Sequence, residues 1–275
     1  MTAPPRVYFS FRSPYSWIAM RLLAERLGDA CDSLEYIPFW EPDERTRTIL
    51  KGMGADVLYA PMGREKHLYI LQDIKRIASQ FGYRMAWPVD RNPWWELSHL
   101  AYLFACSRGR GAEFFWGIHA ARWEQGQDIS LTSTVRGVAE GSGLDPDETM
   151  CALEGDALRQ AGAEVLYRSC VDGVFGVPFF IVDHQKFWGL DRLELFLRTL
   201  AERSRVDPES GGQTTIMSGR NGGFGIGGAL QPSSASCSDL HQDNKDCPVA
   251  GQCAISRELI DQIGAYDNDT AGGCG

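Results

Sequence analysis

The sequence predicts an α/β domain that is interrupted by a helical insertion, and three observations lead to this fold class. Short apolar segments near residues 8 and 180 have the aromatic and β-branched content of buried strands. Between them, residues 45–165 carry apolar side chains at helical spacing, with prolines between the segments. An amphipathic segment follows the second group of strands. The element order is therefore β-α-β, then a helical block, then β-β-α.

The first unit is expected to begin with a strand at residues 7–11 and a helix directly after it. Serine favours the N-cap of a helix and proline its first turn, so Ser13-Pro14 marks the helix start. The helix runs to about Leu27, and residues 34–40 follow as a second strand. The helical block comes next, with Ile70, Ile74 and Ile77 as an example of its spacing.

The second unit is expected to contain a hairpin and a final helix. Residues 179–182 read as a buried strand and residues 186–188 as its partner. Asp191 and Glu194 form a capping-box pattern that opens the last helix. This order is that of a thioredoxin fold with an inserted helical domain. We predict a thioredoxin-like domain at 6–44 and 166–204, a helical insertion at 45–165, and a Gly/Ser/Cys-rich, disordered tail at 205–275.

Composition limits the functions that the chain can have. Its 275 residues carry a net charge of −9 without a long basic run, so nucleic acid is not an expected partner. The sequence shows neither a signal peptide at its start nor an apolar stretch of membrane-spanning length. We therefore expect a cytoplasmic protein that acts on a small molecule. A homodimer and a partner contact through the tail both stay open.

The eight cysteines are unevenly placed and do not form a redox or metal motif. Four are scattered through the first 200 residues and are expected to be reduced structural cysteines. The other four lie in the tail at spacings that fit no zinc pattern. The five histidines also lack metal-ligand spacing, so no metal site is predicted. A Gly-x-Gly-x-x-Gly pattern begins at Gly223, but no strand precedes it and no βαβ unit surrounds it.

Ser13 is the first candidate for chemistry. The unpaired N–H groups and partial positive charge at a helix N-terminus stabilise an anion, including a thiolate. A serine hydroxyl at this point can donate a hydrogen bond to a bound sulfur; helix capping is its alternative role. Positions 13 and 16 are both serine and the chain has no Cys-x-x-Cys. Disulfide exchange, which needs an attacking and a resolving thiol, is therefore disfavoured.

Two further segments are expected to face Ser13. Pro178 begins a buried strand although proline cannot donate to a strand ladder. In a thioredoxin fold this proline follows a cis peptide bond and faces the first helix, which leaves the backbone of Val177 open to a peptide-like ligand. Asp191 is expected at the start of the last helix, where it either caps the helix or contacts an amino group of a ligand.

The chain resembles the 2-hydroxychromene-2-carboxylate isomerase and kappa-class glutathione transferase group of the DsbA-like superfamily. The resemblance covers about residues 6–202. The matching segments are residues 8–17 (YFSFRSPYSW), 66–69 (KHLY) with Asp73 and Arg76, 173–178 (GVFGVP) and 187–193 (FWGLDRL).

This resemblance implies glutathione, or another low-molecular-weight thiol, as the cofactor. Ser13 would be the catalytic serine beside the sulfur, Val177 would pair with the cysteinyl backbone, and Asp191 would hold the γ-glutamyl end. The implied thiol-binding set is Ser13, Tyr15, Val177, Pro178, Leu190, Asp191 and Arg192. Candidates for the substrate side are Lys66, Tyr69, Trp94 and Trp95.

The resemblance also implies the reaction: glutathione-dependent isomerisation of a small conjugated or aromatic substrate through a thiolate stabilised by Ser13. The chain departs from the family at Ser10, at Leu190 and at residues 91–95. A kappa-type glutathione transferase is therefore one alternative. A non-catalytic, DsbA-like peptide-binding protein and a protein of peptide natural-product biosynthesis are the others, because the tail is rich in Ser, Thr and Cys.

Overall fold

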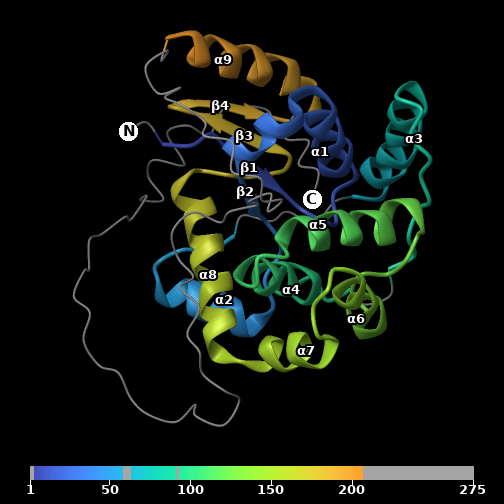
Figure 1. Ribbon diagram of the computed structural model, residues 1–275, viewed down its shortest axis with the longest axis vertical. Helices are drawn as coiled ribbons and strands as arrows, with labels where there is room; N and C mark the ends of the chain where they lie inside the picture. The colour runs from blue at the N-terminus through green and yellow to red at the C-terminus, as the bar shows by residue number, and fades with distance from the viewer. Residues whose placement is uncertain (1–2, 58–62, 91–92, 207–275) are drawn as a thin grey trace.

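The computed structural model describes residues 3–57, 63–90 and 93–206 (Figure 1). The predicted tail lies outside the described residues, except for residues 205 and 206. A four-stranded sheet with the order β2-β1-β3-β4 forms the centre. β1 pairs with β2 in parallel and with β3 antiparallel, and β3 pairs antiparallel with β4. The strands are β1 (Arg6–Phe9), β2 (Glu35–Pro38), β3 (Phe179–Val182) and β4 (Gln185–Trp188).

The first and last parts of the chain build the thioredoxin-like unit around this sheet. β1 leads into α1 (Pro14–Leu27), and the short helix η1 (Gly28–Ser33) returns the chain to β2. After the hairpin, η3 (Leu190–Arg192) and α9 (Leu193–Val206) complete the unit. In the view of Figure 1, α9 covers the sheet above β3 and β4. Phe180 of β3 stacks on Phe196 of α9 with ring centroids 4.9 Å apart.

The middle of the chain is helical, as predicted. Figure 1 shows most of its helices below the sheet, while α3 stands beside α1. The helices are α2 (Glu44–Gly52), α3 (Arg64–Gln80), α4 (Glu96–Ser107), α5 (Gly111–His119), α6 (Thr132–Gly141), α7 (Pro146–Glu154) and α8 (Asp156–Val171), and a π-helical turn, Ala120–Glu124, follows α5.

Two details differ from the sequence predictions. The predicted domain boundary at residues 165 and 166 falls inside α8, which is continuous because it packs on α2 and α4 and also reaches β2. A capping box at Asp191 was expected to open the last helix, and this was wrong. The chain enters α9 through η3, which has no side-chain cap hydrogen bond, and Glu194 instead pairs with Arg26 at 2.9 Å.

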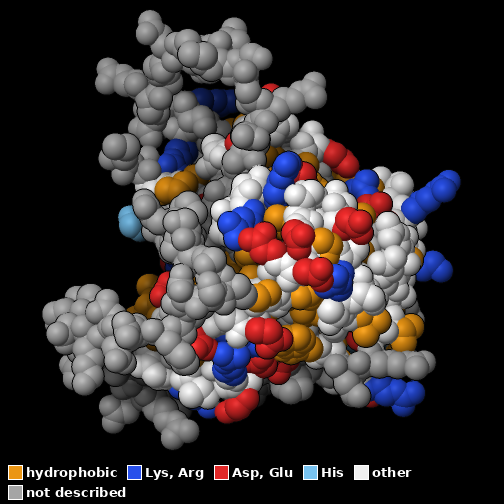
Figure 2. Space-filling model, turned by 60° about the horizontal axis from the view of Figure 1, so that its bottom comes forward, with side chains coloured by type: hydrophobic (Ala, Val, Ile, Leu, Met, Phe, Trp, Pro, Cys, Tyr) orange, Lys and Arg blue, Asp and Glu red, His pale blue; other side chains and the backbone are white. Residues whose placement is uncertain are grey.

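The surface of the described residues agrees with the charge pattern of the sequence. On the face shown in Figure 2, lysines and arginines alternate with aspartates and glutamates and do not form one basic patch. Within the described ranges, the helices are all too short or too polar to cross a membrane.

Replacing Phe180 by alanine should lower the free energy of unfolding by about 3–5 kcal/mol, because the ring is fully buried between the sheet and α9. Leu195→Ala, on the partly exposed side of α9, should cost about 0.5 kcal/mol. Urea unfolding of both variants measures the difference. Equal losses would show that α9 does not close the core in this way.

Candidate active site

The turn between β1 and α1 is held together by its own serines. Ser13 is the N-cap of α1, and its Oγ accepts a hydrogen bond from the Ser16 N–H at 3.2 Å. The Ser13 N–H donates to the Ser10 carbonyl at 3.1 Å. The Ser16 Oγ in turn accepts from the Ser10 N–H at 3.3 Å. The two hydroxyls at the positions where a redox relative needs thiols therefore fix the backbone of this turn.

One cavity of about 710 Å³ lies beside the start of α1, and we call it the proline cavity. Val177 and Pro178 line it, and the peptide bond between them is cis, as predicted. Among the described residues, neither the N–H nor the C=O of Val177 has a hydrogen-bond partner. This backbone can therefore pair with a peptide-like ligand in the cavity.

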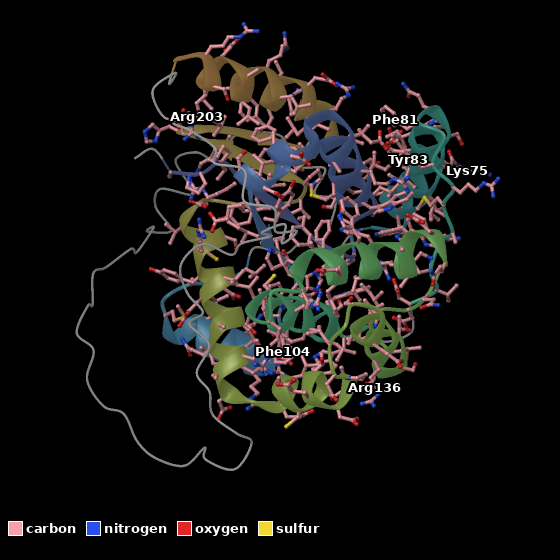
Figure 3. The ribbon with its side chains drawn as sticks, viewed as in Figure 1. Lys75, Phe81, Tyr83, Phe104, Arg136 and Arg203 are labelled. Atoms are coloured by element: carbon pink, nitrogen blue, oxygen red, sulfur yellow. The ribbon has the colours of Figure 1, made fainter. Side chains whose placement is uncertain are left out.

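The far wall of the proline cavity is formed by η3 and the end of β4. Asp191 projects its side chain here with 72% exposure and pairs with Arg192 at 3.0 Å. Its carboxylate folds over Gly189, where a Cβ would lie 2.7 Å from Asp191 Oδ1, and the φ of Gly189 is +96°. Opposite, Ile77 and Phe81 from α3 and the following turn supply apolar surface, and Figure 3 shows Phe81 next to Tyr83 where α3 approaches α1.

A second cavity of about 520 Å³ opens on the other side of the α1 start, and we call it the tryptophan cavity. Four indole rings line it, from Trp87, Trp94, Trp95 and Trp123. The Arg122 guanidinium lies 4.9 Å from the Trp95 ring centre and forms a two-pronged ion pair with Asp90 at 2.8 and 2.9 Å. Because the indoles are flat and apolar, this cavity suits an aromatic or conjugated molecule.

Trp94 is held in the cavity wall by a buried polar network. Its Nε1–H donates to Asp43 Oδ2 at 3.1 Å, and the Arg159 guanidinium pairs with the same carboxylate while lying 5.6 Å from the Trp94 ring centre. Burial alone would raise the pKa of Asp43, but hydrogen bonds from Thr46, Arg159 and Trp94 outweigh it and lower that pKa. Asp43 therefore stays ionised and keeps the indole in place.

Glu96 completes this network from the start of α4. Its carboxylate accepts from Trp40 Nε1, from the Asp43 N–H and from Thr46 Oγ1, at 3.1, 2.9 and 2.6 Å. Burial raises the pKa of Glu96 in spite of these hydrogen bonds. The side chain is fully buried, so it orders the wall without reaching the cavity.

Tyr15 is the one described residue that lines both cavities. Its hydroxyl donates to Asp73 Oδ2 at 2.7 Å, which ties the start of α1 to α3. Ser13 lies two residues earlier with 0% exposure and lines neither cavity, although its neighbours Arg12 and Pro14 line the tryptophan cavity. The two cavities therefore meet beside Tyr15, next to the Ser13 turn, and ligands bound in them would meet at this point.

The structure sorts the predicted site residues into four groups. Val177, Pro178, Leu190, Asp191 and Arg192 line the proline cavity, Trp94 and Trp95 line the tryptophan cavity, and Tyr15 belongs to both. Ser13, Lys66 and Tyr69 line neither cavity.

We did not predict from the sequence which face of α3 turns toward the cavities. Tyr69 lies 57% exposed on the outer side of α3. His67 and Ile70 line the tryptophan cavity, while Asp73 and Ile77 line the proline cavity. These residues follow one another at intervals of three, three and four, and this helical spacing could have identified the face.

The described residues provide no thiol or metal cluster at the site. Cys31, Cys106, Cys151 and Cys170 are free, and they line neither cavity. Cys151 is exposed and not a buried structural cysteine. In the described part of the chain, no group of three or more His, Cys, Asp or Glu side chains could hold a metal ion.

Two histidines are buried behind the tryptophan cavity. His99 Nδ1 lies 2.6 Å from the Trp95 carbonyl, and His99 Nε2 lies 3.3 Å from the Phe11 nitrogen. His119 packs among aromatic rings, and neither of its nitrogens has a hydrogen-bond partner among the described residues. Burial lowers the pKa of both imidazoles to about 3, so both are neutral at physiological pH.

Comparison with known proteins agrees with this architecture. Residues 6–201 match the model of the DsbA-like thioredoxin domain. The chain belongs to the DsbA-like thioredoxin domain family. The predicted fold and superfamily are thereby confirmed.

Curated relatives extend the resemblance. The 2-hydroxychromene-2-carboxylate isomerase of Sphingobium xenophagum is 28% identical over 199 residues, which cover 70% of this chain and 96% of the relative. The isomerase of the same name from Pseudomonas putida is 23% identical over 68% of this chain and 88% of its own length. The resemblance to this isomerase group is thereby confirmed.

Solved structures show the same fold. A structure of 2-hydroxychromene-2-carboxylate isomerase superposes with a TM-score of 0.59 at 22% identity, covering 75% of this chain and 98% of the other. The probable DsbA oxidoreductase of Streptomyces coelicolor superposes with a TM-score of 0.54 at 17% identity, covering 78% and 94%. At these identities the structures support the fold alone.

The two neutral histidines should make the protein sensitive to acid. Their folded pKa values lie below the unfolded value of ~6.5, so the unfolded state binds protons that the folded state does not. Their contribution to stability is full above pH ~6.5 and falls by about 1.4 kcal/mol per pH unit for each histidine as pH drops toward 3. Urea unfolding between pH 7 and 4 should show a shallower pH dependence for His119→Phe. Equal slopes in the wild type and in His119→Phe would contradict the neutral state of His119.

Proposed function

We propose that the protein is a thiol-dependent isomerase that acts on a small conjugated or aromatic substrate. The observation that carries the proposal is the meeting of two different cavities at Tyr15, at the N-terminal end of α1. One cavity offers free backbone groups and the other offers indole rings. The names of the curated relatives support an isomerase.

Glutathione is the thiol we propose for the proline cavity. The unpaired N–H and C=O of Val177 suit the cysteinyl backbone of the tripeptide, and Asp191 suits its amino group. Leu190 offers no polar contact at the corresponding wall, so another low-molecular-weight thiol with a peptide-like backbone would fit the same groups. The proposal includes a cytoplasmic location, because thiols stay reduced there.

The start of α1 is the part of the chain that favours the charged form of a sulfur. Its partial positive charge stabilises an anion by about 0.3–1 kcal/mol, and by up to ~2 kcal/mol when partly buried. Ser13 Oγ accepts from the Ser16 N–H, which leaves its O–H available to donate. Because Ser13 is fully buried and lines neither cavity, donation to a sulfur at Tyr15 requires its side chain or its turn to move when the thiol binds. We propose this donation as the catalytic role of Ser13.

A bound thiol supplies a nucleophile that adds reversibly to a conjugated double bond, so that the carbon–carbon bond can rotate before the thiol leaves. The protein's own residues orient the substrate for this chemistry. The indoles of Trp94 and Trp95 hold its flat face, and Arg12 lies at the rim between the tryptophan cavity and Ser13. Exclusion of water by these rings strengthens the polar contacts at the reacting atoms.

Product analysis separates this function from its nearest alternative. An isomerase releases the thiol unchanged, whereas a kappa-type glutathione transferase leaves it attached to the product. The proposal has two additions. Residues 205–275 contact a partner, which a pull-down with the whole chain can test, and the protein forms a homodimer, which a sedimentation experiment can test.

Glutathione should bind the whole protein in a calorimetric titration, and 2-hydroxychromene-2-carboxylate should then be isomerised in its presence. Ser13→Ala should reduce turnover about 10- to 100-fold, because a hydrogen bond to a charged sulfur is lost. It should also cost about 1 kcal/mol of stability through the lost helix cap.

Asp145→Ala is the matched control for the stability loss. Asp145 caps α7 with two N–H contacts, far along the chain from the cavities, so its loss should lower stability and leave turnover unchanged. Absence of binding by glutathione and by cysteine would refute the thiol-binding role. Full turnover by Ser13→Ala would remove Ser13 from the mechanism.

The tryptophan cavity should set the affinity for the substrate. Trp94→Ala should raise KM about ten- to hundred-fold, since a buried indole wall is lost. Tyr69→Ala, which changes an exposed residue outside both cavities, should leave KM within about twofold. Steady-state kinetics at saturating thiol measure both values, and the reverse order of effects would move the substrate to the outer face of α3.

A further inference from the structure

The peptide groups of Phe11 are held at both ends by side chains of the helical insertion. Its N–H faces His99 Nε2 at 3.3 Å, and its C=O accepts from Trp123 Nε1 at 3.0 Å. Phe11 is fully buried, two residues before Ser13. The strand-to-helix turn of the first unit therefore depends on hydrogen bonds from α4 and from the π-helical turn after α5.

The hydrogen bonds of His99 fix its tautomer. Nδ1 lies 2.6 Å from the carbonyl oxygen of Trp95, which can only accept, so Nδ1 carries the proton. Nε2 is left with a lone pair, which accepts from the Phe11 N–H. The ring is also stacked on Trp40, with centroids 5.2 Å apart and planes 18° apart. The imidazole thus has one orientation and one set of partners.

The same turn determines where Ser13 lies. Ser10 Oγ is 3.3 Å from His99 Nε2 and accepts from the Arg12 N–H at 3.4 Å. The Ser10 carbonyl accepts from the Ser13 N–H. A shift of the Phe11 peptide groups would therefore move the hydroxyl of Ser13 and the first N–H groups of α1 together.

We propose that His99 and Trp123 are positioning residues for the thiol site, acting through Phe11 from the walls of the tryptophan cavity. Trp123 lines that cavity itself, and His99 holds the carbonyl of Trp95, which also lines it. The inference rests on the proposed function, because it assigns a task to the residues behind Ser13. Neutral His99 suits this task, since its protonation would remove the acceptor for the Phe11 N–H.

Three variants separate the two ends of this arrangement. His99→Gln can place its amide oxygen as an acceptor near the position of Nε2, whereas His99→Asn can keep a donor near Nδ1 but is too short to place an acceptor at Nε2. Trp123→Phe removes the donor to the Phe11 carbonyl and retains an aromatic ring. We expect His99→Asn and Trp123→Phe to raise the pKa of bound glutathione, read from thiolate absorbance at 240 nm, by about one unit and to lower kcat about tenfold. His99→Gln should stay within about threefold of the wild-type kcat.

A purely structural role predicts a different result. Stability would then fall in His99→Asn and Trp123→Phe, while the pKa of the bound thiol stayed at the wild-type value, and this outcome would overturn the inference. If His99→Gln shows the same rise in thiol pKa and the same loss of kcat as His99→Asn, the role assigned to Nε2 is overturned.

Hydrogen exchange at the Phe11 and Ser13 N–H groups tests the positioning role without depending on the proposed function. If the wild-type protein binds no thiol, the function fails, but exchange still reports on the turn. His99→Asn should then increase exchange at both N–H groups more than at the buried N–H groups of α9. Equal increases throughout the protein would contradict the positioning role.

Discussion

The constraint on which the site depends is the conformation of four residues, 10–13, between β1 and α1. Within them, one backbone N–H is taken by the Ser16 hydroxyl and one carbonyl by the Ser13 N–H. The side chain of Ser13 then caps the helix. Since a helix N-terminus stabilises an anion only over its first turn, this short segment determines where a negative charge can sit. Both cavities are arranged around that point.

The helical insertion contributes more than one wall of a cleft. It reaches back to the first unit through Trp123 and His99, and through the Tyr15–Asp73 hydrogen bond from α3. Its Arg159 also pairs with the ionised Asp43 of the first unit, and this pair holds the indole of Trp94 in the wall of the tryptophan cavity. Breaking a buried pair of this kind leaves one charge uncompensated, at a typical cost of about 3–5 kcal/mol. Shape in the tryptophan cavity is therefore maintained by electrostatics as well as by packing.

Local sequence signals predicted most of the fold, and eight of the eleven predicted site residues line one of the two cavities. Ser13-Pro14 placed the start of α1, because capping chemistry is local, and the buried strand at 179–182 was found at its correct bounds. The Asp191 capping box failed because the chain turns through η3 before α9, which a four-residue pattern does not reveal. Tyr69 was placed on the substrate side because a segment match does not say which face of a helix is outward. His99 was not singled out, since its partners lie 4, 88 and 89 residues away in the sequence.

Ser16 has a consequence for any attempt to introduce disulfide chemistry at the site. In a disulfide-exchanging relative this position would provide the resolving thiol, but here its oxygen is an acceptor for the Ser10 N–H at 3.3 Å. Sulfur is a larger and weaker acceptor than oxygen. Introducing cysteine at positions 13 and 16 would therefore weaken the backbone turn at the same moment as it supplied the thiols. The serines at positions 13 and 16 are thus part of the framework of the turn, and a thiol pair at these positions would require the turn to be rebuilt first.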